Sequence, residues 1–174
     1  ITSGSVTIDL TRLPYTEEGY VKVTGYTDAK HVNATVEKKL GNTEATKQWA
    51  FSAWCSGYGY PKTVAFFQDR LCLGGSEKQP YVLWMSRTGD YNNFSVETAA
   101  GNVTDDSAVA LSFVSRKQFE IRHLVPNTDL LILTKGNEWI LSGNDVITPS
   151  NATPKMQTTR GCGNVEPIMI GNKT

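Results

Sequence analysis

The sequence predicts an all-β protein with little helix. Short apolar runs rich in Val, Leu, Phe, Tyr and Trp recur along the chain, and Gly, Pro, Asn, Asp and Ser separate them. Runs of this length and composition, bounded by turn residues, are typical of antiparallel strands. Several runs also alternate between apolar and polar residues, which places one face of a strand on a core and the other in water.

Residues 1–45 are expected to form a small β module, such as a barrel-like insertion. Apolar and polar residues alternate in three stretches of this module: Val6–Leu10, Val21–Val23 and Val32–Val36. Breakers such as Leu13-Pro14 separate the first two stretches. We expect no site chemistry in this module, and His31 is interpreted as a surface strand residue.

An aromatic segment opens the second predicted domain, residues 46–174. The segment WAFSAWCSGYGYP, residues 49–61, contains two Trp, one Phe and two Tyr. Such rings commonly fill an irregular loop at a domain junction. Exposed rings would instead offer a platform on which sugars stack, so both interpretations remain open. The candidate interaction platform consists of Trp49, Trp54, Tyr58 and Tyr60.

Two similar groups of strands are predicted after the aromatic segment. The expected strands of the first group are Thr63–Phe67, Arg70–Leu73 and Tyr81–Ser86. Those that follow are Ala108–Val114, Glu120–Val125, Asp129–Thr134 and Glu138–Ser142. Pro126 ends one of these strands, and Lys135-Gly136-Asn137 is a tight hairpin signal.

These groups repeat at an interval of 56 to 60 residues. Leu71 falls 60 residues before Leu131, and Ser86 falls 56 residues before Ser142. A period of this size with several strands in each repeat is typical of β-propeller blades, although a sandwich meander could mimic it. We therefore expect part of a β-propeller, with about two blade-like antiparallel units. Its predicted core residues are Leu71, Leu73, Trp84, Leu131, Leu133 and Trp139.

The last segment is expected to contain an outer strand and the start of a third unit. Met156–Arg160 is the predicted outer strand, and Val165–Ile170 is predicted to open another strand. A strand without a partner exposes unpaired backbone groups and favours aggregation. We therefore expect the sequence to be a piece of a longer polypeptide, with this strand lying on earlier strands or on a neighbouring copy.

Composition and motifs argue against several classes of function. The formal net charge is +0, whereas a protein that grips phosphates usually has a basic excess. Cys55, Cys72 and Cys162 are expected to be free thiols, since none forms a CxxC pair. No nucleophile motif, P-loop or metal cluster is visible, so we expect no enzyme activity and no cofactor. No run of 18 apolar residues occurs, so we expect no membrane association. The pair Asp105-Asp106 is interpreted as a solvated turn, with a loop cap or a weak cation ligand as the alternatives.

The chain resembles a family of bacteriophage tail proteins. FFQDRLCLGG and LWMSRTGDYNNF are similar to a segment of the large tail component of short-tailed phages called nozzle, tail tubular protein B or stabilisation protein. WAFSAWCSGYGYP precedes this segment, and TDDSAVALSFVSR, IRHLVP and DLLILTKGNEW follow it, in the family's order. The resemblance covers about residues 45–174, and it rests on the order and spacing of several segments rather than on one chemical motif.

The resemblance implies a structural virion component, and that family is also known for a propeller. Copies of the full-length protein would associate in a ring at the distal part of a short tail, together with other tail proteins. Double-stranded DNA would pass through the ring without specific binding. The virion would be assembled in the host cytoplasm. The alternative is a carbohydrate-recognising or glycan-cleaving β domain of a phage or cell-surface protein.

Overall fold

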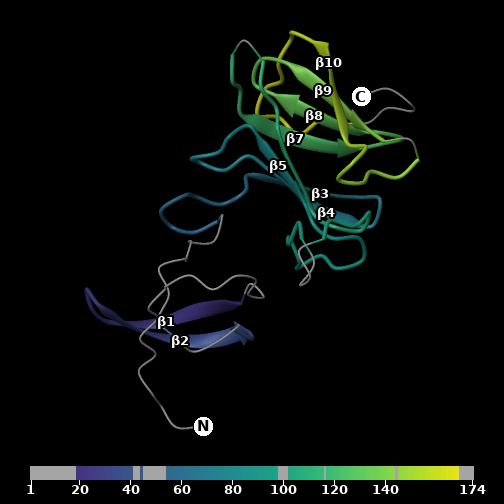
Figure 1. Ribbon diagram of the computed structural model, residues 1–174. Helices are drawn as coiled ribbons and strands as arrows, with labels where there is room; N and C mark the ends of the chain where they lie inside the picture. Colours follow the sequence, from purple (N-terminus) through teal and green to yellow (C-terminus); the bar gives the residue numbers. More distant parts are fainter. Residues whose placement is uncertain are drawn as a thin grey trace. The chain divides into compact units, whose positions relative to one another are not determined.

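The computed structural model describes residues 19–40, 44, 54–97, 102–115, 117–143 and 145–168. These residues form ten strands and no helix (Figure 1), which confirms the all-β class. None of the described segments is a helix that could cross a membrane. The chain divides into two compact units, Ile1–Phe51 and Ser52–Thr174.

The described part of the first unit is one antiparallel hairpin. Strand β1 (Tyr20–Asp28) pairs with β2 (His31–Lys38) through a short turn. The carboxylate of Asp28 accepts hydrogen bonds from Lys30 N at 2.7 Å and from His31 Nδ1 at 2.9 Å, which closes the turn. The exposed position of His31 on β2 agrees with its interpretation as a surface residue. The strand expected at Val6–Leu10 lies outside the described residues.

The second unit contains two four-stranded antiparallel meanders, each with its strands in sequence order. The first meander consists of β3 (Thr63–Phe67), β4 (Arg70–Gly74), β5 (Val82–Met85) and β6 (Val109–Ser112). The second meander consists of β7 (Ile121–Pro126), β8 (Leu130–Thr134), β9 (Glu138–Ser142) and β10 (Thr153–Thr158). Figure 1 shows β7 to β10 side by side in green and yellow above the teal strands of the first meander.

The two meanders bury one face each against the other. Strands β3 and β4 contact β7, so the first strands of the two meanders lie closest together. A single apolar cluster fills the space between the sheets. Its members are Phe67, Cys72, Leu83, Met85, Val109, Phe113, Ile121, Leu124, Leu130, Ile132, Leu141 and Ile147. The inner faces that carry these residues are called the core faces below.

The core residues predicted from the sequence are in the right strands, but four are half-buried on the other face, where Trp84 also lies, opposite Leu73. Leu71 and Leu73 of β4 and Leu131 and Leu133 of β8 are only half-buried. The alternate residues of both strands are buried instead, in the same pattern. Expecting these four leucines in the core was therefore wrong by one residue, because adjacent residues of a strand point to opposite faces. Trp84 is buried, and half-buried Trp139 packs edge-on against Phe113 with ring centroids 5.5 Å apart.

The directions of the peptide groups reveal how the two meanders are stacked. In β4 the outward Leu71 O accepts a hydrogen bond from Ser86 N, on the β5 side, so the inward residues of β4 bond toward β3. In β8 the inward Thr134 N donates to Asn137 O, on the β9 side. In a chain of L-residues, side-chain direction and hydrogen-bonding direction are coupled. If the second meander were superimposed on the first, strand by strand, the two core faces would be opposite faces of the sheet. The second meander is therefore stacked on the first in the same orientation and is not flipped over.

The segment after β9 differs from the prediction. The outer strand β10 begins at Thr153, earlier than the expected Met156, and Pro154 is accommodated because β10 lies at the edge of the sheet. The strand expected at Val165–Ile170 is not formed over residues 165–168, and residues 169–170 lie outside the described part. The chain returns instead to the second meander, where Cys162 N donates to Thr134 O at 2.9 Å and Arg122 Nη1 donates to Cys162 O at 2.7 Å.

A matched pair of substitutions in β8 tests the assignment of faces. Ile132 is fully buried, whereas its neighbour Leu131 is half-buried on the outer face. We expect Ile132→Ala to lower the free energy of unfolding by about 2–5 kcal/mol, because it leaves a cavity in the core. Leu131→Ala should cost clearly less, since solvent already reaches that side chain. Denaturant titration measures both values, and a larger loss for Leu131→Ala would reverse the assignment.

Candidate functional site

The aromatic loop before β3 is a tight turn fixed by its backbone. Tyr58 N and Gly59 N both donate to Cys55 O, at 3.1 and 2.8 Å. Gly59 has a φ of +79°, and a Cβ on this residue would lie 2.5 Å from Glu77 Cβ. A side chain is therefore excluded at Gly59 by both conformation and space. Lys78 N donates to Tyr58 O at 3.2 Å, which attaches the turn to the loop before β5.

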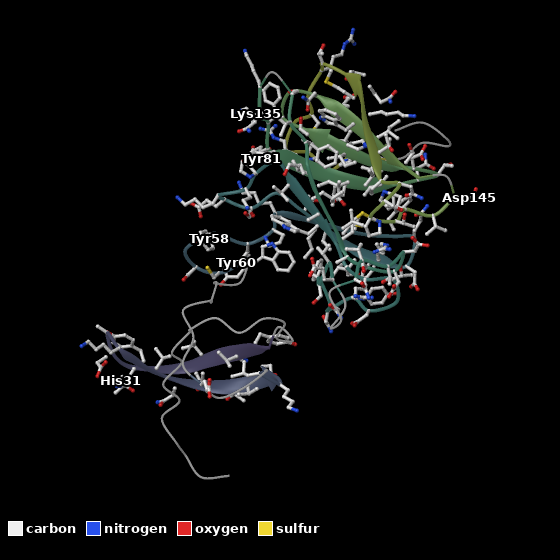
Figure 2. All side chains as sticks on the ribbon, in the orientation of Figure 1. His31, Tyr58, Tyr60, Tyr81, Lys135 and Asp145 are labelled. Carbon is white, nitrogen blue, oxygen red and sulfur yellow. The ribbon has the colours of Figure 1, made fainter. Side chains whose placement is uncertain are left out.

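The predicted aromatic platform is divided by the structure. Trp54 packs edge-on against Trp84 and Phe94, with ring centroids 5.5 and 4.8 Å apart, so it covers β5. Tyr58 and Tyr60 are 46% and 63% exposed on the loop before β3 (Figure 2). Trp49 lies outside the described residues. Of the candidate platform, only the two tyrosines offer exposed rings within the described part of the chain.

The acidic pair Asp105-Asp106 lies in an exposed loop that precedes β6 and fastens this loop. The carboxylate of Asp106 accepts hydrogen bonds from Thr104 Oγ1 and, at 2.6 Å, from Arg87 Nη2. The bond from Thr104 and then the bond from Arg87 lower the pKa of Asp106, because both stabilise the ionised form. Across the residues that the structure describes, no group of three or more His, Cys, Asp or Glu side chains could hold a metal ion. The arrangement fits a loop cap.

Arg70 is the polar residue that the sequence analysis missed. Its side chain is fully buried on the core face of β4, beside the turn that joins β3 to β4. Nη1 donates to Ser86 O and Ser107 O, both at 2.7 Å, and Nη2 donates to Asp105 O at 2.8 Å. The guanidinium therefore ties the end of β5 to the loop before β6. From the sequence, a charged residue at the first position of a strand is expected at the surface. The one signal to the contrary is that Arg70 lies two residues before Cys72, on the same face of β4.

Burial makes the positive charge of Arg70 energetically costly. Backbone carbonyl groups accept hydrogen bonds from Nη1 and Nη2 of its guanidinium. Burial lowers the pKa of the Arg70 guanidinium, and the negative charge of Asp106 partly opposes this shift. Nε is buried without a hydrogen-bond partner. Burial also raises the pKa of the neighbouring Cys72 thiol to about 12, so this thiol stays protonated near neutral pH. Cys55, Cys72 and Cys162 are all free, as expected.

A shallow groove on the outer face of the second meander is the remaining concave feature of note. It encloses about 400 Å³. Its lining residues are Leu131, Leu133, Glu138, Trp139, Ile140, Gln157 and Pro167. Three of these, Leu131, Leu133 and Trp139, are residues that the sequence analysis had assigned to the core. The groove is mainly apolar, so it is suited to packing against another apolar surface rather than to acid–base chemistry.

The comparisons with known proteins add no assignment. A scan against protein-family models finds no match to this chain, and a search of curated proteins finds none that is significantly similar.

The role of Arg70 is tested by a substitution that keeps its charge. We expect Arg70→Lys to lower the free energy of unfolding by about 1.5–3 kcal/mol, because an ammonium group cannot replace the fork that reaches three carbonyls. The exposed Arg160 provides the control, and Arg160→Lys should change stability by less than about 0.5 kcal/mol. Equal stability of the two variants in denaturant titrations would show that the three bonds contribute nothing net.

Proposed function

We propose that this chain belongs to a ring-forming structural protein of a short bacteriophage tail, of the nozzle type. The support from the sequence is the ordered series of segments, from the aromatic loop to DLLILTKGNEW, that resembles this family. The support from the fold is the stacking of two four-stranded meanders in the same sense, with their first strands in contact. Successive propeller blades have this relationship, and this stacking is the observation that carries the proposal.

In this role the protein acts through its shape. Stacked sheets with an apolar core form rigid walls, and the loops between strands provide contacts with neighbouring subunits and other tail proteins. A channel through which duplex DNA slides must not bind phosphates strongly. The formal net charge of +0 suits such passage. The chain would be assembled into the virion in the host cytoplasm, and it would have no catalytic task or cofactor.

Immuno-electron microscopy tests this proposal. An antiserum raised against the chain should label the distal end of the short tail on virions of the phage that encodes it. Virions of an unrelated long-tailed phage serve as the control and should stay unlabelled. Purified, DNA-filled virions that lack the protein, both by labelling and by mass spectrometry, would contradict the proposal.

A second candidate function is carbohydrate recognition, and the exposed rings of Tyr58 and Tyr60 favour it. Aromatic faces stack on sugar rings, and the rigid turn around Gly59 would hold both tyrosines in place. If this candidate is correct, Tyr60→Ala should abolish the signals of the chain on a glycan array. Val103→Ala, which changes an equally accessible apolar residue elsewhere, should preserve them. An array without signals for the unsubstituted chain would eliminate this candidate.

A further inference from the structure

The loops of the second unit lie at two ends, because neighbouring strands of both meanders are antiparallel. At one end are the turns after β3 and β7 and the loops after β5 and β9, and Gln68 Nε2 donates there to Asp145 O at 3.0 Å. At the other end are the segment before β3 and the loops after β4, β6, β8 and β10. Figure 2 shows Lys135 and Tyr58 on one side of the second unit and Asp145 on the opposite side.

Acidic residues dominate the first of these ends, which is called the acidic end below. The acidic residues of its described loops are Asp69, Asp90, Glu97, Asp105, Asp106, Asp129 and Asp145. Among the described residues of these loops, the one basic side chain is that of Arg87, which is paired with Asp106 at 2.6 Å. This end therefore carries a negative charge that the formal net charge of the chain, +0, does not reveal.

Basic residues are in excess at the opposite end, which is called the basic end below. Its described loops contain Lys62, Lys78, Lys117, Lys135 and Arg160, against Glu77, Glu120 and Glu166. Strands β3 and β4, of 5 residues each, separate the two ends by about 16 Å. Exposed charges are screened beyond about 8 Å at physiological ionic strength. A ligand at one end therefore meets the charge of that end and not the net charge of the chain.

Both exposed tyrosines of the aromatic loop lie at the basic end, between two lysines. Lys62 follows Tyr60 closely in the sequence, and Lys78 N donates to Tyr58 O at 3.2 Å. Gly59 fixes the turn between the two rings, because its φ of +79° is a conformation that other residues rarely adopt. The two rings are therefore held beside lysines by a turn with a fixed backbone.

Nearby carboxylates compensate these two lysines only in part. Lys78 is exposed and forms no ion pair within the described part of the chain. Lys62 Nζ lies 3.5 Å from Glu120 Oε2, and Arg122 Nε lies 3.4 Å from Oε1 of the same carboxylate. Two positive charges thus share one negative charge, and the Lys62 side chain is still 51% exposed. Positive charge remains accessible on both sides of the tyrosine pair.

Exposed rings next to ammonium groups are suited to a ligand that has stackable rings and negative charges. Acidic polysaccharides and single-stranded nucleic acids both meet this description. Exposed Glu77 and Glu166, at the same end, would repel a polymer that carries a phosphate on every unit. The same carboxylates can accept hydrogen bonds from sugar hydroxyl groups. The observations therefore favour an acidic polysaccharide, in which neutral hydroxyl groups separate the negative charges.

We propose that the basic end of the second unit binds an acidic polysaccharide. Tyr58 and Tyr60 stack on its sugar rings, and Lys62 and Lys78 pair with its carboxylate groups. This site goes beyond the structural role in a tail and rests on the carbohydrate candidate described above, to which it assigns a class of ligand. The acidic end repels such a polymer, so binding is confined to one end of the unit.

A glycan array of matched pairs tests the proposal. Glycans that contain uronate or sialate are printed beside the same glycans after reduction of their carboxyl groups to alcohols, which removes the charge and keeps the rings. The unsubstituted full chain should bind acidic glycans and should bind their reduced partners about tenfold more weakly, because each lost exposed ion pair changes affinity by up to about fivefold. Added salt should weaken binding to the acidic form, because it screens exposed charges.

Substitution of both lysines locates the site. Lys62→Gln combined with Lys78→Gln should weaken binding to the acidic glycans by about tenfold and should make the remaining binding less dependent on salt. The change in salt dependence distinguishes lost charge from lost folding, and circular dichroism verifies that the variant is folded. Lys155→Gln is the control, since it removes the same charge from an exposed residue of β10 and should leave binding unchanged.

Four results would overturn the proposal. Equal binding of the reduced glycans would eliminate the acidic class and leave the carbohydrate candidate standing. Unchanged binding by the double lysine variant would place the site elsewhere. Tighter binding of a single-stranded oligothymidylate than of every glycan would assign the basic end to nucleic acid. An array without signals would eliminate the site together with the carbohydrate candidate. None of these results changes the labelling of virions, so failure of this inference and failure of the proposed tail function are distinguishable.

Discussion

The structure of the second unit depends on the burial of one face of each meander against the other. No helix covers either sheet within the described residues, so each sheet can remove apolar surface from water only by packing on another sheet. The two sheets are in closest contact at β3 and β7. Gly74 of β4, which has no side chain, also lets β7 approach β4. Phe113 and Ile147, which lie outside the strands, complete the cluster. Turn geometry and loop position follow from this packing, since each loop must bring the next strand back to the same core.

Polar groups then fix the arrangement that the apolar core permits. Gln68, in the turn between β3 and β4, receives a hydrogen bond from Ile147 N at 2.7 Å and donates to Asp145 O at 3.0 Å. One amide side chain thus connects the first meander to the loop after β9, where Asp145 is labelled in Figure 2. Gln68 has a φ of +48°, a conformation that is unfavourable for a residue with a Cβ. Asp69 has a φ of +56°, so both central residues adopt the positive φ of a two-residue hairpin turn, which matches the twist of β3 and β4. Like the side chain of Gln68, that of Arg70 connects separate segments, in this case within the first meander.

The sequence predicted the strands well because turn residues bound them clearly. Thr63–Phe67 and Glu138–Ser142 have the predicted limits, and most other strands differ only at their ends. The assignment of faces failed for a physical reason. Leu130–Thr134 carries apolar residues on both faces, so the alternation of apolar and polar residues cannot show which of its side chains point to the core. In β4 the first of the residues that point to the core is Arg70, and a charged residue is expected to lie in water when only the sequence is considered. Only the register with neighbouring strands, a non-local property, decides both cases.

The candidate site was predictable only in part, for a related reason. Exposure of Tyr58 and Tyr60 follows from a local turn, and that turn is visible in the glycine pattern of the sequence. The groove, in contrast, is formed by residues of β8, β9 and β10 together with Pro167, which are brought together by the sheet and by the returning segment. Its residues carry no motif. Leu131 and Leu133 were predicted as core residues because they are apolar, and they are only half-buried because no third sheet covers them within the described residues.

The stacking of unlike faces leaves the same two outer surfaces, whatever the number of units in the stack. Two sheets related by a two-fold axis would bury like faces and leave like faces outside, so their outer surfaces could both become polar without affecting the core. Here unlike faces are buried, and each added unit of the same kind would cover one free face while it exposes another identical one. The apolar residues of β3 and the hollow on β8 thus persist at the ends of any open stack. Only closure of the stack or a different capping element can remove both from water. The two outer faces are therefore the surfaces at which further units of the same kind would pack.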